Sequence, residues 1–483
     1  MQINARVFLP AGFALIGLIA VPGCKLGPDY QRPVTQEPAN FLGATQTVSA
    51  AVSTNLTQLR NWWLTLNDPL LAELVTRGLT NNLSIQSGIQ KIRQSRAQLA
   101  QANAGLWPTL TGTSSFNYGK KFGDASGVGY SATGAGIAGE WGGTFSGGFD
   151  AAWELDIFGG YRREIEARES EYEGMHYTQR DLEISLASEI ALHYLSIRML
   201  QEAIAVTQSN LVTQSQSADI TRKRHKAKLV SGLDLANAEA QVQMTTAQLP
   251  TLQAALAEYI LNLENLLSEQ PNTRKAQLLD TATFPTLPAG LPTTIPNELL
   301  RRRPDIRQAE TVLKAATARV GVEEAELYPR LSLIGALGAS VPYSPNTWGD
   351  FTESLRLGPR ISWNIFNAGR VKARIEERKA LVEQALLAYQ KTVLNAYNEA
   401  EKAWQNYNEE VKRAAPLQQA VQSNQRAVRI AQGLYKAGYS DYTEVLIAER
   451  SLLAAQDLEV RHRTLRAQKL ITFYKTLGGS ASE

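Results

Sequence analysis

The chain carries one series of motifs twice, and this duplication limits the folds that it can adopt. The segment WELDIFGGYRREIEARES begins at Trp153, and its counterpart WNIFNAGRVKARIEERKA begins at Trp363, 210 positions later. The same offset separates KAKLVSGLDLANAEAQ from KAGYSDYTEVLIAERS, and a third pair of segments, from Ile85 and Ile306, is offset by 221. Short-repeat solenoids have periods of roughly 20 to 50 residues, so these offsets indicate the duplication of a whole architecture.

Each half of the chain repeats one order of elements. A helical stretch is followed by an aromatic-proline pair, a β-like stretch, an Ile-Phe turn with a following glycine, a very long helix, a glycine-containing turn and a returning helix. A length of 483 residues alone would suggest about three domains, but the duplication favours one unit built from two repeats. We predict a signal peptide, an N-terminal segment, a first repeat, a Pro-rich linker, a second repeat and a tail, at 1–23, 24–67, 68–283, 284–304, 305–478 and 479–483.

The first residues predict export. Arg6 precedes an apolar run, residues 7–21, that is shorter than the roughly 20 residues of a membrane-spanning helix and is followed by Pro-Gly-Cys. This pattern is typical of a signal peptide, here with cleavage after Gly23. Cys24 is the only cysteine, so it cannot form a disulfide within the chain, and the pattern predicts that it carries lipid as in bacterial lipoproteins. The alternative is an ordinary exported protein with an incidental cysteine. Lys25 favours the outer membrane by analogy.

The composition argues against nucleic acid binding and against catalysis. The formal net charge of +3 is too balanced for a nucleic-acid surface. Neither a Gly-x-Ser-x-Gly motif nor a P-loop is present. The chain has four histidines without a partner at metal-ligand spacing, namely His176, His193, His225 and His462. We therefore expect no enzyme activity, no metal site, and no cofactor apart from the covalent lipid on Cys24.

Four stretches are predicted to be β-strands, at about 109–119, 144–158, 330–340 and 355–366. In the second stretch, aromatic residues such as Phe149 alternate with polar ones such as Asp150, which is the pattern of a transmembrane strand. Pro359 removes a hydrogen-bond donor from the fourth and indicates a possible bulge. Four strands in lipid would leave two unpaired edges, and single-chain outer-membrane barrels have at least about eight strands. The sequence therefore predicts a barrel shared between copies, without fixing their number.

The helical stretches are too long for an ordinary globular domain. Residues 160–229 contain no proline and one internal glycine, Gly174, and as a helix would reach about 105 Å. Residues 370–432 contain one proline, Pro416, which should kink the helix or restart it. Apolar residues recur at the three- and four-residue spacing of a coiled-coil seam. The sequence thus predicts two antiparallel helical hairpins, at about 160–270 and 368–475. A filamentous coiled coil would not explain the strands.

Four segments carry a resemblance to a known family. They are KLGPDYQRP after Cys24, NWWLTLNDPLLAELV from Asn61, RRPDIRQAE from Arg302 and WNIFNAGR from Trp363. With the lipid-attachment pattern and the duplicated strands and hairpins, they make the chain resemble the outer-membrane factor, or TolC-like, family. Within it, the chain is most similar to the NodT-type lipoprotein branch that serves RND-type efflux pumps.

The resemblance implies an α+β membrane protein that forms a homotrimer. Three chains would build a twelve-stranded outer-membrane β-barrel and a long periplasmic α-helical barrel. The Pro-rich stretch 284–304, with the N-terminal segment and the C-terminal end, would form an equatorial belt around that tunnel. The implied partners are a periplasmic adaptor protein, an inner-membrane RND-type pump and outer-membrane lipid.

The implied function is that of a passive channel in a tripartite efflux system. The pump and adaptor would load small molecules, and this chain would supply the path through the outer membrane. Two alternatives stay open at this point: an outer-membrane duct for type I protein secretion, and a lipid-anchored coiled-coil spacer without a pore. The sequence does not identify the exported substrate, because drugs, solvents and metal ions all pass through similar ducts.

In the resembling family the hairpin tips form a periplasmic mouth that is closed at rest. Matching positions make Asp441 and Glu444 candidate gate acids, with Asp234 as the first-hairpin counterpart. The alternative role for these carboxylates is helix capping. The predicted adaptor-contacting tips are Lys228, Leu229, Val230, Ser231 and Gly232 in the first hairpin, and Gly438, Tyr439 and Ser440 in the second.

The tips also depart from the family pattern. Lys228 stands where the family usually has glycine, which puts the backbone geometry of the first tip in question. Ile447 stands where a further acid is often found, so one ring of charge is expected to be missing. Three basic residues near the first tip could be partners of the gate acids, but a solvated face is the favoured interpretation; they are Arg222, Lys223 and Arg224.

Overall fold

The computed structural model describes residues 23–34, 61–120, 141–280, 284–285, 287, 291, 301–344 and 347–478. The chain forms two compact units, one comprising Met1–Pro33, Arg93–Gly174 and Glu310–Leu387, and the other Val34–Ile92, Met175–Ala309 and Ala388–Glu483. Each unit takes segments from both halves of the sequence, so the compact units do not coincide with the two predicted repeats. The predicted signal peptide up to residue 22, most of the linker 284–304 and the tail 479–483 lie outside the described residues.

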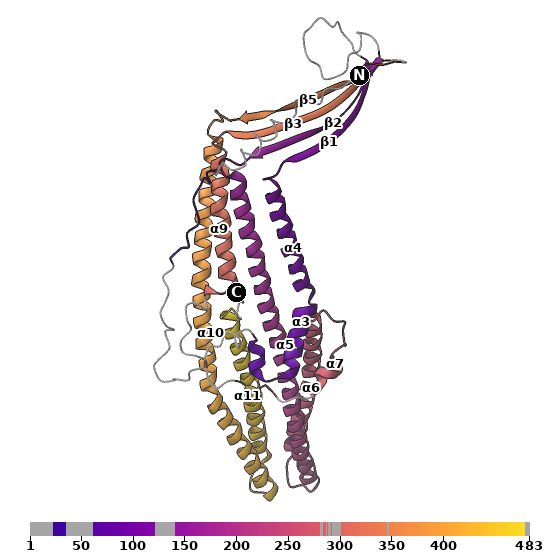
Figure 1. Cartoon of the computed structure of the whole chain (residues 1–483). Helices are drawn as coiled ribbons and strands as arrows, with labels where there is room; N and C mark the ends of the chain where they lie inside the picture. The colour runs from indigo at the N-terminus through magenta and orange to yellow at the C-terminus, as the bar shows by residue number, and fades with distance from the viewer. Residues whose placement is uncertain are drawn as a thin grey trace. The chain divides into compact units, whose positions relative to one another are not determined.

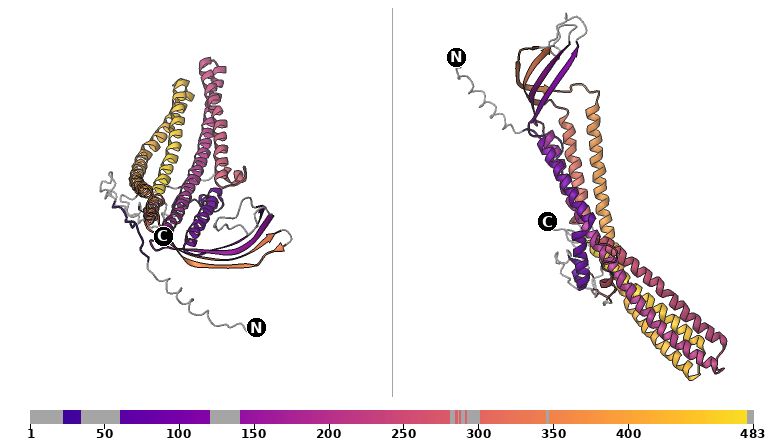
Figure 2. Two further views of the ribbon diagram at one scale, coloured as in Figure 1. Left: turned by 90° about the horizontal axis from the view of Figure 1, so that it is seen from above. Right: turned by 90° about the vertical axis from the view of Figure 1, so that its right-hand side faces the viewer.

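The first unit contains an antiparallel sheet. Its long strands are β1 (Thr109–Lys120), β2 (Trp141–Leu155), β3 (Arg330–Ser344) and β5 (Thr352–Ser362), and a two-residue strand, β4 (Thr347–Trp348), pairs with the end of β3. β1 pairs with β2, β2 with β3, and β3 with β5, so the long strands run in sequence order across the sheet. Figures 1 and 2 show them side by side in one curved layer.

The strand ends differ from the alternation pattern. β2 ends at Leu155 rather than at Phe158, because Asp156 leaves the sheet to cap the next helix. Its two carboxylate oxygens accept the backbone N–H groups of Tyr161 and Arg162, both at 3.1 Å. β5 likewise ends at Ser362 rather than at Phe366. Alternation of residue types therefore continues past the point at which the ladder stops.

One face of the sheet is apolar and exposed. The register places Phe149 beside Leu337, and Leu337 beside Leu355. These three side chains are 57%, 55% and 79% exposed. In the adjacent row on the opposite face, Asp150 and Arg356 flank Ala336. An apolar face this large requires an apolar environment, whereas the polar face suits water.

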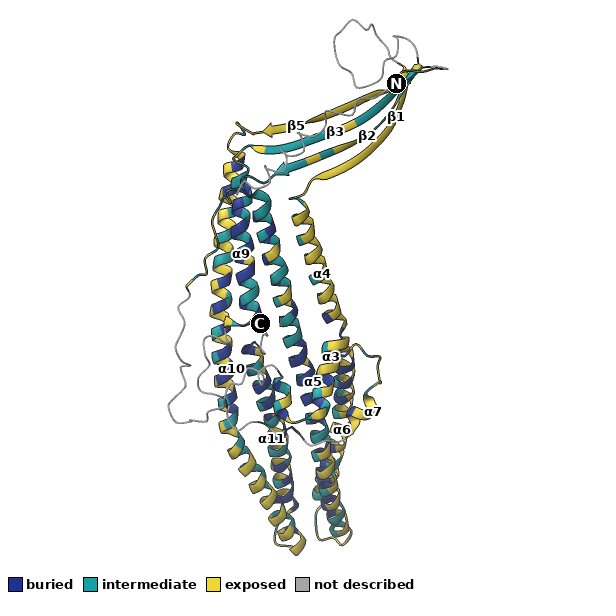
Figure 3. Ribbon diagram, in the orientation of Figure 1, coloured by how far each residue is buried: buried dark blue, intermediate teal, exposed yellow. Residues whose placement is uncertain are grey.

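The edge strands are exposed along nearly all of their length. Among the described strands, β1 pairs only with β2, and every residue of β1 is exposed (Figure 3). Pro359 lies on the other edge strand, β5, where a missing ladder donor is tolerated. The register of β5 against β3 runs without interruption from Arg330 opposite Ser362 to Ser340 opposite Thr352. No bulge accompanies Pro359, contrary to one reading of the sequence.

Two pairs of long helices follow the predicted order. α5 (Gly160–Lys226) has 67 residues and α10 (Arg370–Ala437) has 68, while α6 (Gly232–Leu266) and α11 (Tyr442–Thr476) have 35 each. The shorter helices are α3 (Pro69–Asn81), α4 (Leu83–Ala104), α7 (Lys275–Leu279) and α9 (Pro304–Ala325), with a 3-10 turn, η2, at Trp62–Leu66. α10 continues through Pro416, so the helix does not restart there. In the described part of the chain, no helix has the length and apolarity needed to cross a membrane.

The duplication is visible in individual contacts. The indole Nε1 of Trp153 donates to the carbonyl of Leu106 at 2.9 Å, and that of Trp363 donates to the carbonyl of Leu327 at 3.1 Å. The donors are 210 positions apart and the acceptors 221 apart, which are the two offsets found in the sequence. The two halves therefore share side-chain geometry as well as element order.

The core of the second unit lies where both hairpins meet η2 and α3. Apolar residues of α5, such as Ile190 and Ile197, are fully buried there together with Tyr407 of α10 and Leu470 of α11. The segment from Asn61 enters this core because Asp68 caps α3. The Oδ1 of Asp68 accepts the N–H groups of Leu70 and Leu71 at 3.0 and 3.1 Å, and the Oδ2 of Asp68 accepts a hydrogen bond from the buried hydroxyl of Tyr194 at 2.5 Å.

Candidate functional sites at the hairpin tips and the N-terminal segment

Both hairpin tips close with the same backbone geometry. Lys228 has φ 57° and Gly438 has φ 84°, 210 positions later. The next residue of each tip returns its N–H to the helix end: Leu229 to the carbonyl of Arg224, and Tyr439 to that of Leu434, both at 2.9 Å. This is the left-handed helix ending in which glycine carries no steric cost. The lysine therefore keeps the turn, in a strained backbone conformation.

We expect Lys228→Gly to stabilise the first tip by about 1 kcal/mol, because glycine removes the left-handed strain. The larger conformational entropy of glycine in the unfolded chain offsets part of that stabilisation. Hydrogen exchange of the amides around residues 224–232 would measure the local opening free energy. The reverse change at the duplicated position, Gly438→Lys, should weaken the second tip by a similar amount. Faster exchange in Lys228→Gly would contradict the strain assignment.

Asp234 caps the first returning helix. Its carboxylate accepts the N–H of Ser231 at 3.1 Å and the Oγ–H of Ser231 at 2.8 Å, while the N–H of Asp234 donates back to the serine Oγ at 3.2 Å. This reciprocal arrangement is a capping box. The capping alternative that the sequence left open is therefore present at this residue.

The second tip uses its acids differently. Asp441 is the N-cap residue of α11, yet its side chain makes no capping hydrogen bond. Glu444, the counterpart of Asp234, lies in the first turn of α11, and both carboxylates are exposed. Each lies near the positive end of the helix, where a negative charge is stabilised. The acids that the sequence singled out thus divide into one capping residue and two solvent-facing ones.

Most of the predicted adaptor-contacting residues are accessible. Six of the eight are exposed, and Val230 and Ser440 are half-buried. Apolar side chains stand out among them, because Leu229 is 67% exposed and Tyr439 84%. Leu233, which the sequence did not single out, is 70% exposed beside them in the chain. These three exposed apolar side chains are candidates for contact with a partner protein.

Polar contacts tie the first hairpin to the second. The rungs of this ladder are Asn210 to Gln456 at 2.8 Å, Ser217 to Glu449 at 2.7 Å, Tyr435 to Thr221 at 3.0 Å and Arg450 to Gln241 at 2.9 Å. Close to the tips they surround a small apolar cluster that includes Ala218, Tyr435 and Tyr442. An interface held by side-chain hydrogen bonds can exchange them for water when the hairpins separate.

Glu449 is the buried acid of this ladder. Its side chain accepts the hydroxyl of Ser217 and the amide of Gln432, at 2.7 and 3.1 Å, and the residue is 3% exposed. Among the described residues, neither its second oxygen, Oε2, nor the nearby buried hydroxyl of Tyr442 has a hydrogen-bond partner. Because the group is removed from water, the pKa of the Glu449 carboxyl is raised. A carboxyl held this way favours its neutral form.

The basic residues near the first tip have three different settings. Arg222 pairs with Glu239 at 3.0 Å, and Lys223 pairs with Asp219 at 2.7 Å, all on exposed side chains. Arg224 instead donates to the carbonyl of Tyr435, and its guanidinium lies 4.6 Å from the centre of that ring. The expectation of a solvated face is therefore wrong for Arg224, which joins α5 to α10.

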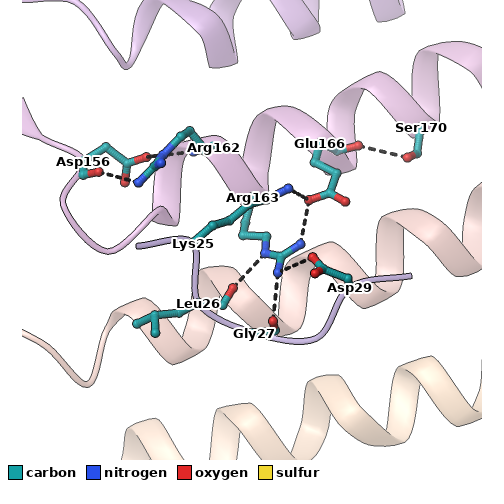
Figure 4. A network of polar contacts seen from close by, with 9 residues as sticks. All are labelled: Lys25, Leu26, Gly27, Asp29, Asp156, Arg162, Arg163, Glu166 and Ser170. Carbon is teal, nitrogen blue, oxygen red and sulfur yellow. Dashed lines mark hydrogen bonds and ion pairs between the residues drawn. The ribbon is translucent and has the colours of Figure 1, made fainter. Parts of the chain in front are cut away.

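The N-terminal segment is fixed to the first unit by a buried arginine. Arg163, 1% exposed, donates through Nε to the carbonyl of Leu26 at 2.7 Å and through Nη2 to that of Gly27 at 2.8 Å (Figure 4). Ion pairs to Asp29 at 2.9 Å and Glu166 at 2.8 Å balance its charge. Gly27, with φ 87°, lies so close to Gly321 that an added Cβ would be 2.4 Å from the Cα of that residue. Both glycines are thus required by contact.

The remainder of the segment KLGPDYQRP is held by α9. Tyr30 donates its hydroxyl to Glu310 at 3.2 Å, Arg32 pairs with the same carboxylate at 3.4 Å, and Lys314 lies 5.7 Å from the centre of the Tyr30 ring. The segment is therefore a structural strap. It leaves Cys24 exposed, just before the residues that Arg163 holds.

The fold is that of outer-membrane channels. The solved structure of the outer-membrane channel OprN is 31% identical to this chain, with a TM-score of 0.82, over 94% of this chain and 99% of that one. Together with the duplicated hairpins and the exposed apolar sheet, this likeness defines an α+β channel protein of the TolC-like class.

The family follows from sequence comparison. The family described as outer membrane efflux protein matches residues 74–269 and 295–479, and the chain belongs to that family. The pyoverdine export outer membrane protein OpmQ of Pseudomonas aeruginosa is 30% identical over 89% of each chain. The cation efflux system protein CusC of Escherichia coli O6:H1 is 29% identical over 95% of this chain and 96% of that one. The protein is therefore an efflux channel of the outer membrane that extends into the periplasm.

Proposed function

We propose that this chain is the passive exit channel of a tripartite efflux system, working with a periplasmic adaptor and an inner-membrane RND-type pump. The observation that carries the proposal is the sheet of the first unit, which combines an exposed apolar face and a polar opposite face with two edge strands, β1 and β5, that each pair on one side only among the described residues. Such a sheet is complete only when lipid covers one face and other strands cover the edges. The proposal assigns no catalytic step to the chain.

The proposed assembly is a homotrimer. Because the long strands alternate in direction from β1 to β5, the β5 edge of one copy can pair antiparallel with the β1 edge of the next. Three copies of four long strands would give a closed barrel of twelve. Lipid on Cys24 would add an anchor to the outer membrane beside this barrel.

Light scattering of the purified protein, with the detergent contribution subtracted, should give the mass of three chains, slightly below the 159 kDa of three uncleaved chains of 53.0 kDa each because residues 1–23 are removed. Single-channel recording in a planar bilayer should then detect conductance. A monomer, or a trimer without any conductance, would contradict the channel and favour a lipid-anchored spacer.

Barrel assembly should persist in Cys24→Ser, because the strands rather than the lipid supply the edge pairing.

The exposed apolar side chains of the tips support the adaptor contact. Leu229, Leu233 and Tyr439 offer an apolar surface to the loop of another protein, and the neighbouring capping groups fix the backbone that presents them. The relatives' names mention pyoverdine and cations, so the substrate class is not shared across the family. We propose small molecules as the cargo, with the pump setting the choice among them.

The proposed gate charges are those of the tip acids Asp441 and Glu444, and Asp234 contributes by fixing the backbone of the first hairpin through its capping box with Ser231. Rings of acids at a narrow mouth attract cations. Opening requires the two hairpins of a chain to separate at the polar ladder, and an adaptor can favour that state only through a higher affinity for it.

A further inference from the structure

We propose that Arg162 binds the amide carbonyl of a fatty acyl group on the α-amine of Cys24, and that it thereby distinguishes the N-acylated chain from one with a free amine. The ligand is a long-chain fatty acyl amide. The inference rests on the proposed lipidation of Cys24 and goes beyond it by assigning a residue that recognises the finished N-terminus.

The guanidinium of Arg162 contacts the backbone carbonyls of Gly23 and Cys24. Its Nη1 donates to the carbonyl of Gly23 at 2.9 Å, and its Nη2 donates to the carbonyl of Cys24 at 3.2 Å. Asp156 fixes the orientation of the guanidinium. Nε donates to the Asp156 carboxylate at 3.0 Å, and Nη2 also donates to the Asp156 carbonyl at 2.9 Å. Within the described residues, the guanidinium of Arg162 therefore contacts Asp156 and the carbonyls of Gly23 and Cys24. These two carbonyls lie on either side of the Cys24 nitrogen and Cα.

A carbon branch at the Cα of Gly23 would collide with neighbouring atoms, whereas the methylene that is present fits. A Cβ added to Gly23 would lie 2.7 Å from the carbonyl oxygen of Ile157 and 2.9 Å from that of Asp156, and 2.6 Å from the Nη2 of Arg162. Two of these three neighbours are backbone atoms, which cannot move aside as a side chain can. The contact is therefore selective for an unbranched carbon next to the carbonyl.

A fatty acyl amide has the same atoms at this place. In the precursor, the Cys24 nitrogen bears the group –C(=O)–CH₂–NH– of Gly23. Hydrolysis of the Gly23–Cys24 bond leaves an amine; acyl transfer from a phospholipid ester to the neutral amine forms an amide and releases a lysophospholipid. The nitrogen then bears –C(=O)–CH₂–R. The carbonyl that accepts from Arg162 and the methylene that fits the space are both restored.

A free amine lacks these features. It offers no carbonyl to Nη1, and an α-amino group with an ordinary pKa of about 7.7 to 8.0 is largely protonated at neutral pH. A positive charge would then lie beside the guanidinium. The segment that follows is positioned independently, because Arg163 holds the carbonyls of Leu26 and Gly27 (Figure 4). Arg162 is therefore the residue that recognises the acyl amide on the Cys24 nitrogen.

The test compares two forms of the full-length protein, purified in detergent from hosts with and without the N-acylation step. Mass spectrometry of the N-terminal peptide first identifies the form. Hydrogen exchange is then followed in a peptide that starts at Cys24 and includes residues 25–29. We expect exchange to be about tenfold slower in the N-acylated form, the factor that one charge-assisted hydrogen bond supplies.

Arg162→Gln should remove this difference. Arg168→Gln is the matched control: Arg168 lies on the same helix and pairs with Glu164 and Glu171 without touching the segment, so the difference should persist. Equal exchange in two forms of proven mass would overturn the role of Arg162, as would a difference that survives Arg162→Gln. An unmodified Cys24 in the mass spectrum would overturn the proposed lipidation together with this inference, so the two failures are distinguishable.

Discussion

Glu449→Gln should hold the two hairpins of each chain together more firmly at neutral pH and should remove the pH dependence of their separation. The Glu449 carboxyl is buried between Ser217 of α5 and Gln432 of α10, and burial raises its pKa. A glutamine keeps the shape and the accepting oxygen without a charge. Its new N–H group has a candidate acceptor in the buried Tyr442 hydroxyl, for which the described part of the chain supplies no hydrogen-bond partner.

The direction of the pH effect follows from linkage. A carboxyl whose pKa is higher in the packed state than in the separated state favours packing when it is protonated. This stabilisation is fully present below the ordinary carboxyl pKa of 4.5 and is lost as the pH rises through the raised value. Resting conductance of the wild-type channel should therefore increase from acidic to neutral pH, as the hairpins separate more often.

The expected size is that of a buried polar group left without its partner, about 1 to 3 kcal/mol, or roughly 5- to 150-fold in the opening equilibrium. Open probability recorded from pH 5 to pH 8 would measure it in both proteins. Glu239→Gln is the matched control, since Glu239 is the counterpart of Glu449 210 positions earlier and pairs on the surface with Arg222. Its effect should stay below about 0.5 kcal/mol. An unchanged pH profile in Glu449→Gln would rule out this acid as the cause.

The duplication explains why the architecture could be predicted. Periodicity and offset are properties of the sequence, and the equivalent hydrogen bonds of Trp153 and Trp363 follow from them. The ends of the strands could not be read in the same way. Asp156 continues the alternation of β2, yet its carboxylate caps α5, and this competition between sheet and cap is decided by three-dimensional contact.

The interior of the tips could not be predicted because it depends on contacts between distant segments. Glu449 has the sequence surroundings of a solvated helical acid, and its partner Ser217 is 232 positions away. Arg224 was assigned to a solvated face for the same reason. One feature of the sequence did indicate the buried acid. Gln432 occupies the position that matches Arg222, so Glu449 lacks the cationic partner that its counterpart Glu239 has.

Asp441→Asn combined with Glu444→Gln should reduce the preference of the channel for cations by about threefold or more, the factor for a change of one kT in the potential at the mouth. In the proposed trimer the two changes remove six negative charges, two from each of three chains. Both carboxylates are exposed, and that of Asp441 makes no capping bond, so their charge acts on ions in the mouth. Reversal potentials in asymmetric salt would measure the change.

Asp234→Asn is the control that separates gating from capping. Its carboxylate is engaged by Ser231, so we expect a loss of about 1 kcal/mol in helix stability and little change in selectivity. An equal change in selectivity from Asp234→Asn would place the first-hairpin acid at the mouth as well, and no change from the double substitution would remove Asp441 and Glu444 from it. Salt supplies a second criterion, because the Debye length falls from about 30 Å at 0.01 M to about 3 Å at 1 M. A true charge effect must shrink over that range, whereas an effect of altered tip structure would persist.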